Sequence, residues 1–141
     1  MISLYKSDDY SIICEIWEKS VRATHDFLSA EDREFYKSLV SKYFPKSIIY
    51  TFEEEDVVKG FLGVGDQNID MLFVSPDYIG QGVGKVLLLY AMEELGLSQV
   101  DVNEQNTHAF CFYTHFGFKV VSRDELDGFG KPYPILHLKK F

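Results

Sequence analysis

Hydrophobic residues recur at helical spacing in two early segments of the chain. In the first segment the apolar positions on one face are Ile12, Ile13, Ile16, Trp17 and Val21. They predict an amphipathic helix that ends at about residue 23, and Ser7 with the two aspartates after it suits the helix start. In the second segment, Ser29 can cap a helix that Pro45 stops. Its predicted inner positions are Phe35, Leu39, Val40 and Tyr43.

Runs rich in β-branched and aromatic residues indicate strands. The predicted strands are residues 2–5, 47–52, 57–64, 69–74, 99–102, 118–122 and 134–139. The acidic stretch 53–56 divides two of them and is interpreted as a hairpin turn. Two further helices separate the later strands: one covers residues 83–95, and the other can be capped by Asn106 and ends at Gly117.

The order of these elements is β-α-α-β-β-β-α-β-α-β-β. Hairpins come first, strand–helix alternation follows, and a pair of strands closes the chain, which predicts an α/β fold with a mixed sheet and helices on both faces. With 141 residues, 46% of them hydrophobic and 16% aromatic, the chain can bury one sizeable core. We therefore expect a single domain over residues 1–141.

Charge and hydropathy exclude several classes of protein. A formal net charge of −8 and a pI near 4.9 argue against a nucleic-acid-binding surface and slightly favour cationic partners. No apolar run approaches the roughly 20 residues of a membrane span. The N-terminal segment lacks a basic region followed by an apolar stretch, so no secretory signal is expected and a cytoplasmic location is the default.

Cysteine and histidine spacing gives no sign of a disulfide framework or a metal site. Cys14 and Cys111 lie far apart in apolar helical contexts and are expected to be buried free thiols. His108 and His115 are expected to face solvent, and His137 lies on a predicted strand. None of them has the spacing of metal ligands, so we expect no metal.

Three glycines stand between a predicted strand and a predicted helix, at Gly80, Gly82 and Gly84. Such a turn gathers free backbone N–H groups at the positive end of the helix dipole and makes an anion site, to which Lys85 adds charge. A Walker A loop is excluded because the spacing is one residue short and Val86 replaces the hydroxyl residue. A dinucleotide fingerprint is excluded because the glycine spacing is GxGxG. A loop whose glycines only allow close strand–helix packing remains an alternative.

The surroundings of this loop resemble the GNAT superfamily of N-acyltransferases. The stretch IGQGVGK occupies the place of the family signature [QR]xxGxG/A, after the strand-and-turn run MLFVSPDY. The stretch VNEQNTHAFCFYTHFGF is similar to the later signature V…N…A…FY…GF, with Asn106, Ala109 and Tyr113 at the expected spacings. The chain departs from the pattern at Ile79, where the family has arginine or glutamine.

The resemblance implies a fold, a cosubstrate and a set of residues that bind it. The fold would be a mostly antiparallel sheet of about seven strands, and the cosubstrate would be acetyl-CoA. Its pyrophosphate would bind the backbone amides of Gly80, Gln81, Gly82, Val83, Gly84 and Lys85. Its pantetheine arm would pair with the strand edge at Leu72, Phe73 and Val74. Asn106 and Ala109 would also lie at the cofactor, although Asn106 serves equally as a helix cap.

The chemistry of amine acetylation suggests further roles. Tyr113 is the candidate acid for the departing thiolate, and family members commonly use a tyrosine there; a core tyrosine is the alternative. Tyr113 shares a helix face with Asn106, Ala109 and Phe110, and the face with Phe112 and Phe116 suits the core. A backbone N–H near Phe73 or Val74 would stabilise the developing oxyanion.

The general base and the acceptor site are less sharply indicated. Asp70 is a candidate base, because strict alternation puts it on the face of Leu72 and Val74, but it also suits a surface position. The family often shapes its acceptor site from the first inter-helix loop, which makes His25 and Asp26 candidate substrate-binding residues. Tyr133 is a further candidate over the acceptor pocket or a packing residue. Water can relay the proton if no strong base is present.

These observations predict an N-acetyltransferase that acts by direct attack of a primary amine, since neither cysteine has a catalytic signature. A non-catalytic acyl-CoA-binding module on the same fold and an interaction protein without cofactor are the alternatives. The acceptor stays open between a small-molecule amine and a protein amine. No nucleic-acid or membrane partner is expected, and no feature indicates an oligomeric state.

Overall fold

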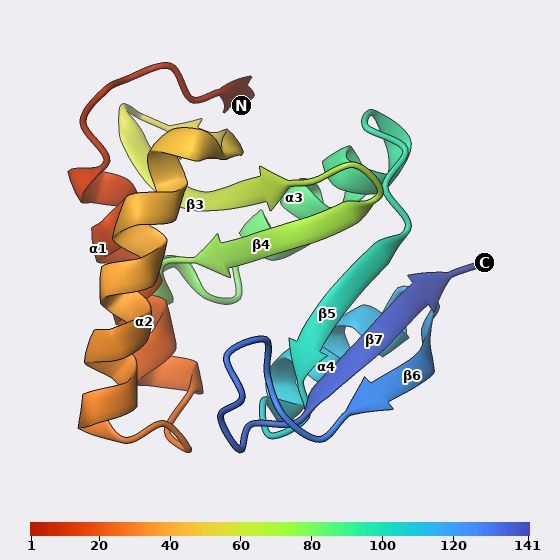
Figure 1. Cartoon of the computed structure of the whole chain (residues 1–141). Coiled ribbons are helices and arrows are strands. Elements are labelled where there is room, and N and C mark those ends of the chain that lie inside the picture. The colour runs from red at the N-terminus through yellow and green to blue at the C-terminus, as the bar shows by residue number, and fades with distance from the viewer.

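The computed structural model describes residues 1–141, arranged around one seven-stranded sheet (Figure 1). The strands are β1 (Ile2–Leu4), β2 (Ile48–Glu54), β3 (Val57–Val64), β4 (Asn68–Val74), β5 (Gln99–Asn103), β6 (Phe118–Asp124) and β7 (Ile135–Lys140). The helices are α1 (Ser11–Thr24), α2 (Ala30–Tyr43), α3 (Val83–Glu93) and α4 (Thr107–His115), with short 3₁₀ turns η1 (Phe44–Lys46) and η2 (Pro76–Tyr78). This order confirms the predicted fold.

The sheet opens between β4 and β5. The strand order is β1-β2-β3-β4-β5-β7-β6, and only β4 and β5 are parallel. Their pairing is confined to Asn68 with Gln99 and Ile69 with Val100. Beyond these pairs the two strands diverge, as Figure 1 shows. The rest of β4 therefore has a hydrogen-bonded neighbour on one side only.

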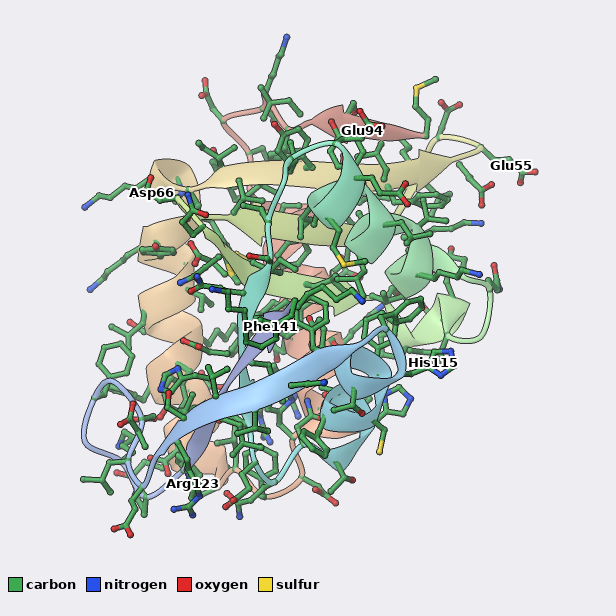
Figure 2. The ribbon with its side chains drawn as sticks, turned by 90° about the vertical axis from the view of Figure 1, so that its right-hand side faces the viewer. Glu55, Asp66, Glu94, His115, Arg123 and Phe141 are labelled. Atoms are coloured by element: carbon green, nitrogen blue, oxygen red, sulfur yellow. The ribbon has the colours of Figure 1, made fainter.

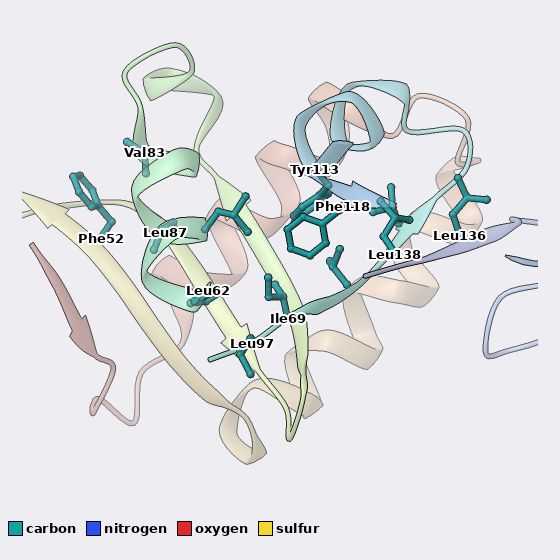
Figure 3. Close-up of a cluster of buried hydrophobic side chains, with 14 residues drawn as sticks. Phe52, Leu62, Ile69, Val83, Leu87, Leu97, Tyr113, Phe118, Leu136 and Leu138 are labelled. Carbon is teal, nitrogen blue, oxygen red and sulfur yellow. The ribbon is translucent and has the colours of Figure 1, made fainter. Parts of the chain in front are cut away.

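Helices cover both faces of the sheet. On one face, α1 and α2 pack against β2 to β4, and the buried core there includes Ile13, Trp17, Phe44 and Phe61. On the other face, α3 and α4 cover a larger cluster of 14 buried residues, drawn in Figure 3. None of the helices is long and apolar enough to cross a bilayer.

Caps and turns form where the local chemistry predicts them. Ser29 Oγ accepts a hydrogen bond from Asp32 N at 3.1 Å, and Asn106 Oδ1 accepts one from Ala109 N at 3.1 Å, so both predicted helix caps are confirmed. The β2–β3 hairpin turns at Glu55 and Asp56, whose φ angles of 53° and 64° are those of a two-residue type I′ turn.

The start of α1 and the inner face of α2 differ from the predictions. Ser7 Oγ accepts a bond from Asp9 N at 3.0 Å and Asp9 Oδ1 accepts one from Ser11 N at 2.9 Å. These residues therefore shape a turn before α1, which begins only at Ser11. In α2, Phe35 and Tyr43 are 39% and 51% exposed, so that part of the predicted inner stripe is wrong.

The cysteine and histidine placements were predicted only in part. Cys14 is half-buried, whereas Cys111 is exposed, so the expectation of two buried thiols is wrong. His108 and His115 are exposed, and His115 projects from the end of α4 (Figure 2). His137 lies in β7 as predicted.

Candidate active site

The free edge of β4 presents the peptide groups of two residues. Ser75 N donates to Lys59 O at 2.9 Å, and Phe61 lies opposite Phe73 two residues further along this antiparallel ladder. Alternation along such a ladder directs the N–H and C=O of Phe73 toward β3 and those of Leu72 and Val74 toward the open side. The proposed oxyanion donor at Phe73 is therefore excluded by the strand register, while Val74 keeps a suitable orientation.

The glycine loop presents a series of unpaired backbone donors. None of the six amides from Gly80 to Lys85 donates a hydrogen bond to another group of the protein. The last three belong to the first turn of α3, where the helix dipole adds positive potential. Lys85 is exposed beside them. These donors and charges suit a phosphate group.

The three glycines lie in two different environments. Gly80 and Gly82 have φ angles of +83° and +80°, and a Cβ added to either would meet no atom within 4 Å. They are needed for a left-handed backbone beside open space, not for packing. A Cβ on Gly84 would lie 3.5 Å from Val74 Cγ2 and 3.6 Å from Phe112 Cζ, which are ordinary contact distances. Gly84 is therefore the one glycine of the three in a packed contact, and that contact does not require glycine.

A cavity of about 340 Å³ joins these elements. Its walls come from β4 (Leu72, Phe73, Val74), the glycine loop and first turn of α3 (Ile79, Gly80, Gly82, Val83, Gly84, Lys85), α4 with its cap (Asn106, His108, Ala109, Phe112, Tyr113), Tyr78, and the end of α1 (Ser20, Thr24, His25). The sequence did not indicate that His108, Phe112, Ser20 or Thr24 would line this cavity. Gln81 is exposed and does not line the cavity.

Tyr113 lines this cavity, and its hydroxyl has no hydrogen-bond partner in the protein. Tyr113 is 6% exposed, and its ring packs edge-on against Phe112 and Phe118, with centroid distances of 5.2 Å and 5.6 Å. Figure 3 shows Tyr113 beside Phe118. Arg33 Nε is the only fully buried side-chain nitrogen or oxygen that lacks a partner, so the unbonded Tyr113 hydroxyl is not sealed off. Burial raises the pKa of Tyr113 above its usual range, which keeps the phenol protonated at neutral pH.

A second cavity of about 230 Å³ adjoins the first. His25 and Phe73 line both cavities and form the partition between them. Burial lowers the pKa of His25 to about 4 despite the opposing charge of Asp26, so the imidazole is neutral at pH 7. Asp26 itself is exposed and lines neither cavity, so the structure does not place it in the site.

The outer wall of the second cavity comes from the β6–β7 loop, which is bound to α2. Tyr36 donates a hydrogen bond to Asp127, and Tyr133 donates one to Asp32. Lys131 Nζ lies 2.9 Å from the same Asp32. Tyr133 is 8% exposed, so it packs within the fold as well as lining this cavity. The other four residues were not identified from the sequence, because these partners are more than 90 positions apart.

Asp70 lies outside the site, because a bulge interrupts the strand alternation. Gly63 pairs with Met71 and Val64 pairs with Ile69, so Asp70 is the extra residue on β4. Ile69, and not Asp70, then packs with Leu72 and Val74 in the larger core cluster. Asp70 is exposed and lines neither cavity; partial burial and the nearby Asp101 and Asp66 raise its pKa. The prediction that it faces the substrate channel is therefore wrong.

Comparisons with known proteins agree with this geometry. A family model described as an acetyltransferase (GNAT) domain matches residues 45–120, more than half of the chain. The chain is 40% identical over 141 residues to the peptidyl-lysine N-acetyltransferase YjaB of Salmonella typhimurium, with 98% of this chain and 97% of that protein covered. The solution structure of apo-form YjaB from Escherichia coli superposes with a TM-score of 0.87 at 42% identity, covering 99% of this chain and 97% of that one.

A more distant structure shares the fold. The PaiA N-acetyltransferase of Thermoplasma acidophilum, solved in complex with coenzyme A, gives a TM-score of 0.68 at 23% identity, covering 100% of this chain and 99% of that one. The present chain belongs to the GNAT family of acetyltransferases. It transfers an acetyl group from acetyl-CoA to an amine.

Proposed function

We propose that the protein acetylates lysine side chains of other proteins, and that the ε-amine reaches the acetyl group through the second cavity. Two relatives of high coverage, the YjaB proteins of Salmonella typhimurium and Escherichia coli, are both named as peptidyl-lysine N-acetyltransferases. The cavity has apolar walls from residues such as Trp17, Val21 and Leu28, which suit the four-carbon stem of lysine. A net charge of −8 favours approach of a lysine-bearing segment.

The chain's own groups fit acetyl-CoA. The unpaired amides from Gly80 to Lys85 would hold its pyrophosphate, with the Lys85 ammonium as an added charge. The outward peptide groups of Leu72 and the outward carbonyl of Val74 would pair with its pantetheine amides as an added strand would. When bound, the cosubstrate supplies a thioester as the acetyl donor. Ile79 lacks the side-chain donors that the family signature has there.

Two groups would stabilise the charges that develop during transfer. The Val74 N–H faces the open edge and would donate to the thioester oxygen as it becomes negative. The Tyr113 hydroxyl would donate its proton to the departing sulfur. The proton that the amine loses would then return to the Tyr113 oxygen. Cys14 and Cys111 line neither cavity, which supports direct attack by the amine over an acyl-enzyme.

The observation that carries this proposal is the junction of three unsatisfied features in one cavity: a row of free amides, a free strand edge and an unpaired buried hydroxyl. No group of the protein occupies these donors and acceptors, so they are available to a ligand. All three line the first cavity, which shares His25 and Phe73 with the second, and a ternary complex of donor and acceptor requires two such adjoining spaces.

A thiol-release assay with acetyl-CoA tests the proposal. We expect the wild-type protein to acetylate lysine-containing peptides faster than free polyamines or amino acids, with loss of signal when lysine is replaced by arginine. Tyr113→Phe should lower kcat by about 100-fold, the usual worth of a positioned general acid, and leave acetyl-CoA binding unchanged by calorimetry. Faster turnover of a small amine would contradict the lysine assignment. Unchanged kcat in Tyr113→Phe would remove the phenol from the mechanism.

A further inference from the structure

His25 ends α1 in a fixed orientation between the two cavities. Its backbone N–H donates to Val21 O at 2.8 Å, and its carbonyl accepts from Leu28 N at 3.1 Å, so the main chain is bonded on both sides. The ring packs beside Phe27 with a centroid distance of 5.2 Å. The imidazole is therefore held at the partition rather than free in the loop.

The neighbouring threonine determines which ring nitrogen carries the proton. Thr24 Oγ1 lies 2.7 Å from the carbonyl oxygen of Ser20, which can only accept, so the single hydroxyl proton is committed to that bond. Thr24 Oγ1 also lies 2.7 Å from His25 Nδ1. The hydroxyl must accept in this second contact, and Nδ1 must donate. The neutral ring is thus the Nδ1–H tautomer, with the lone pair on Nε2.

The Nε2 atom is the free end of this chain of hydrogen bonds. It has no hydrogen-bond partner in the protein, and it is not among the sealed unpaired atoms, since Arg33 Nε is the only one. His25 lines both cavities. We call the first, which would hold acetyl-CoA, the donor cavity, and the second, which would hold the lysine side chain, the acceptor cavity. His25 Nε2 is thus an accessible hydrogen-bond acceptor among mostly apolar groups, and it can accept one N–H group of a ligand.

We propose that His25 Nε2 positions the attacking amine by accepting a hydrogen bond from one of its N–H groups, with Thr24 and Ser20 fixing the tautomer. The inference rests on the proposed transfer to a lysine amine. The amine lone pair is then free to point into the donor cavity, and His25 takes up no proton. A pKa of about 4 fits this role, because so weak a base orients an amine without retaining its proton.

Two replacements of His25 separate positioning from structure. His25→Asn keeps an amide N–H near the place of Nδ1 for Thr24 but has nothing at Nε2. His25→Gln has a longer side chain, which can place an amide oxygen near the position of Nε2. With a lysine peptide we expect His25→Asn to lose about 10- to 100-fold in kcat/KM and His25→Gln to recover part of that loss. Acetyl-CoA affinity should stay within about twofold of wild type in both, since neither removes a phosphate or pantetheine contact.

Thr24→Val and Asp26→Asn complete the test. Thr24→Val should lower the rate severalfold in the wild-type background and cause no further loss in His25→Asn, because the hydroxyl acts only through the imidazole. Asp26→Asn changes an exposed neighbour and should leave the rate unchanged. Equal losses in the Asn and Gln variants, additive losses with Thr24→Val, or full activity in His25→Asn would overturn the proposal.

Nitrogen-15 NMR of the imidazole gives a readout that does not depend on turnover. We expect a protonated Nδ1 and an unprotonated Nε2 in the free protein at pH 7; the opposite tautomer would overturn the inference. If the wild-type protein leaves lysine peptides unmodified, the proposed acceptor is wrong, and the same variants are compared on the amine that the panel identifies. Failure of the acceptor and failure of His25 are thus distinguished.

Discussion

The hydroxyl of Tyr36 donates a hydrogen bond to the carboxylate of Asp127 and so joins α2 to the β6–β7 loop across 91 positions of sequence. The other carboxylate oxygen of Asp127 accepts the backbone N–H groups of Phe129 and Lys131 at 2.9 Å and 3.0 Å. One side chain therefore shapes the loop and fixes it over the second cavity. Burial, together with this contact, raises the pKa of Tyr36 above its usual range.

Removal of this hydroxyl should loosen the wall of the second cavity, which we propose receives the lysine side chain. For Tyr36→Phe we expect the KM for a lysine peptide to rise about tenfold, since a hydrogen bond to a charged group is worth about 1.5–3 kcal/mol. Acetyl-CoA affinity should not change, because the loop does not line the donor cavity. Tyr43→Phe is the matched control, as Tyr43 also lies on α2 but is 51% exposed. Equal KM values in both variants would show that the contact does not shape the acceptor site.

Gly82 and Gly84 should respond differently to alanine. In Gly82→Ala, the φ angle of +80° strains the new side chain, and we expect a loss of about 1 kcal/mol in the free energy of unfolding. Acetyl-CoA affinity should fall too, because the amide row shifts. In Gly84→Ala the Cβ meets ordinary contacts of 3.5 Å and 3.6 Å, so stability should be kept. Urea unfolding and calorimetry measure both; a stable, tightly binding Gly82→Ala would refute the argument from backbone conformation.

Ile79 offers a gain-of-affinity experiment. It is 54% exposed and lines the donor cavity, so a longer polar side chain is tolerated there. Ile79→Arg adds a charge near the phosphate site and should tighten acetyl-CoA binding about fivefold, equivalent to about 1 kcal/mol, with a steeper dependence on salt. Ile79→Gln adds hydrogen bonding without charge and should show little added salt dependence. No change in either variant would mean that this position does not face the phosphates.

His25 should make the protein less stable in acid. Its pKa of about 4 in the folded state lies below the usual value of 6.5, so the unfolded chain takes up a proton first as the pH falls. Stability is then complete above about pH 6.5 and is lost between that pH and about pH 4, by up to about 3 kcal/mol. His25→Asn should flatten the urea-unfolding profile in this range. An equally steep profile in the variant would assign the acid sensitivity to other groups.

His137 should act in the opposite direction. Its ring nitrogens lie 2.7 Å from Asp124 Oδ2 and 2.6 Å from Asp101 Oδ1, and these bonds raise its pKa above 6.5. The contribution is therefore present below pH 6.5 and disappears as the pH rises through the raised value. Because all three groups are partly or largely exposed, we expect less than about 1 kcal/mol. His137→Gln should remove this decline; a variant that still loses the same stability above neutral pH would exclude His137 as its source.

Features that depend on neighbouring residues were predictable from the sequence. Ser29 and Asn106 cap their helices through bonds to residues three positions away. The Gly80 and Gly82 turn also follows from local backbone preference, since left-handed φ angles select glycine. The family resemblance also predicted that Tyr113 belongs to the same site as this loop. The structure places Tyr113 in the wall of the same cavity.

Features that depend on register or on distant contacts were not predictable. The Asp70 bulge leaves no mark in the alternation of a short strand, so the inferred face was wrong. The exposed Phe35 shows the same difficulty for a helix whose apolar stripe is irregular. The bond from Tyr133 to Asp32 joins positions 101 residues apart, and no local pattern reports such a pairing.

The divergence of β4 from β5 has a consequence for mutational tolerance. At Leu72 and Val74 the groups available to the thioester arm are peptide groups, which every residue except proline supplies in full. Replacement of either side chain by another apolar one should therefore alter which acyl chains fit and not whether the carrier binds. Variation at these two positions offers a route to longer donors such as propionyl or butyryl thioesters while the rest of the machinery stays as it is.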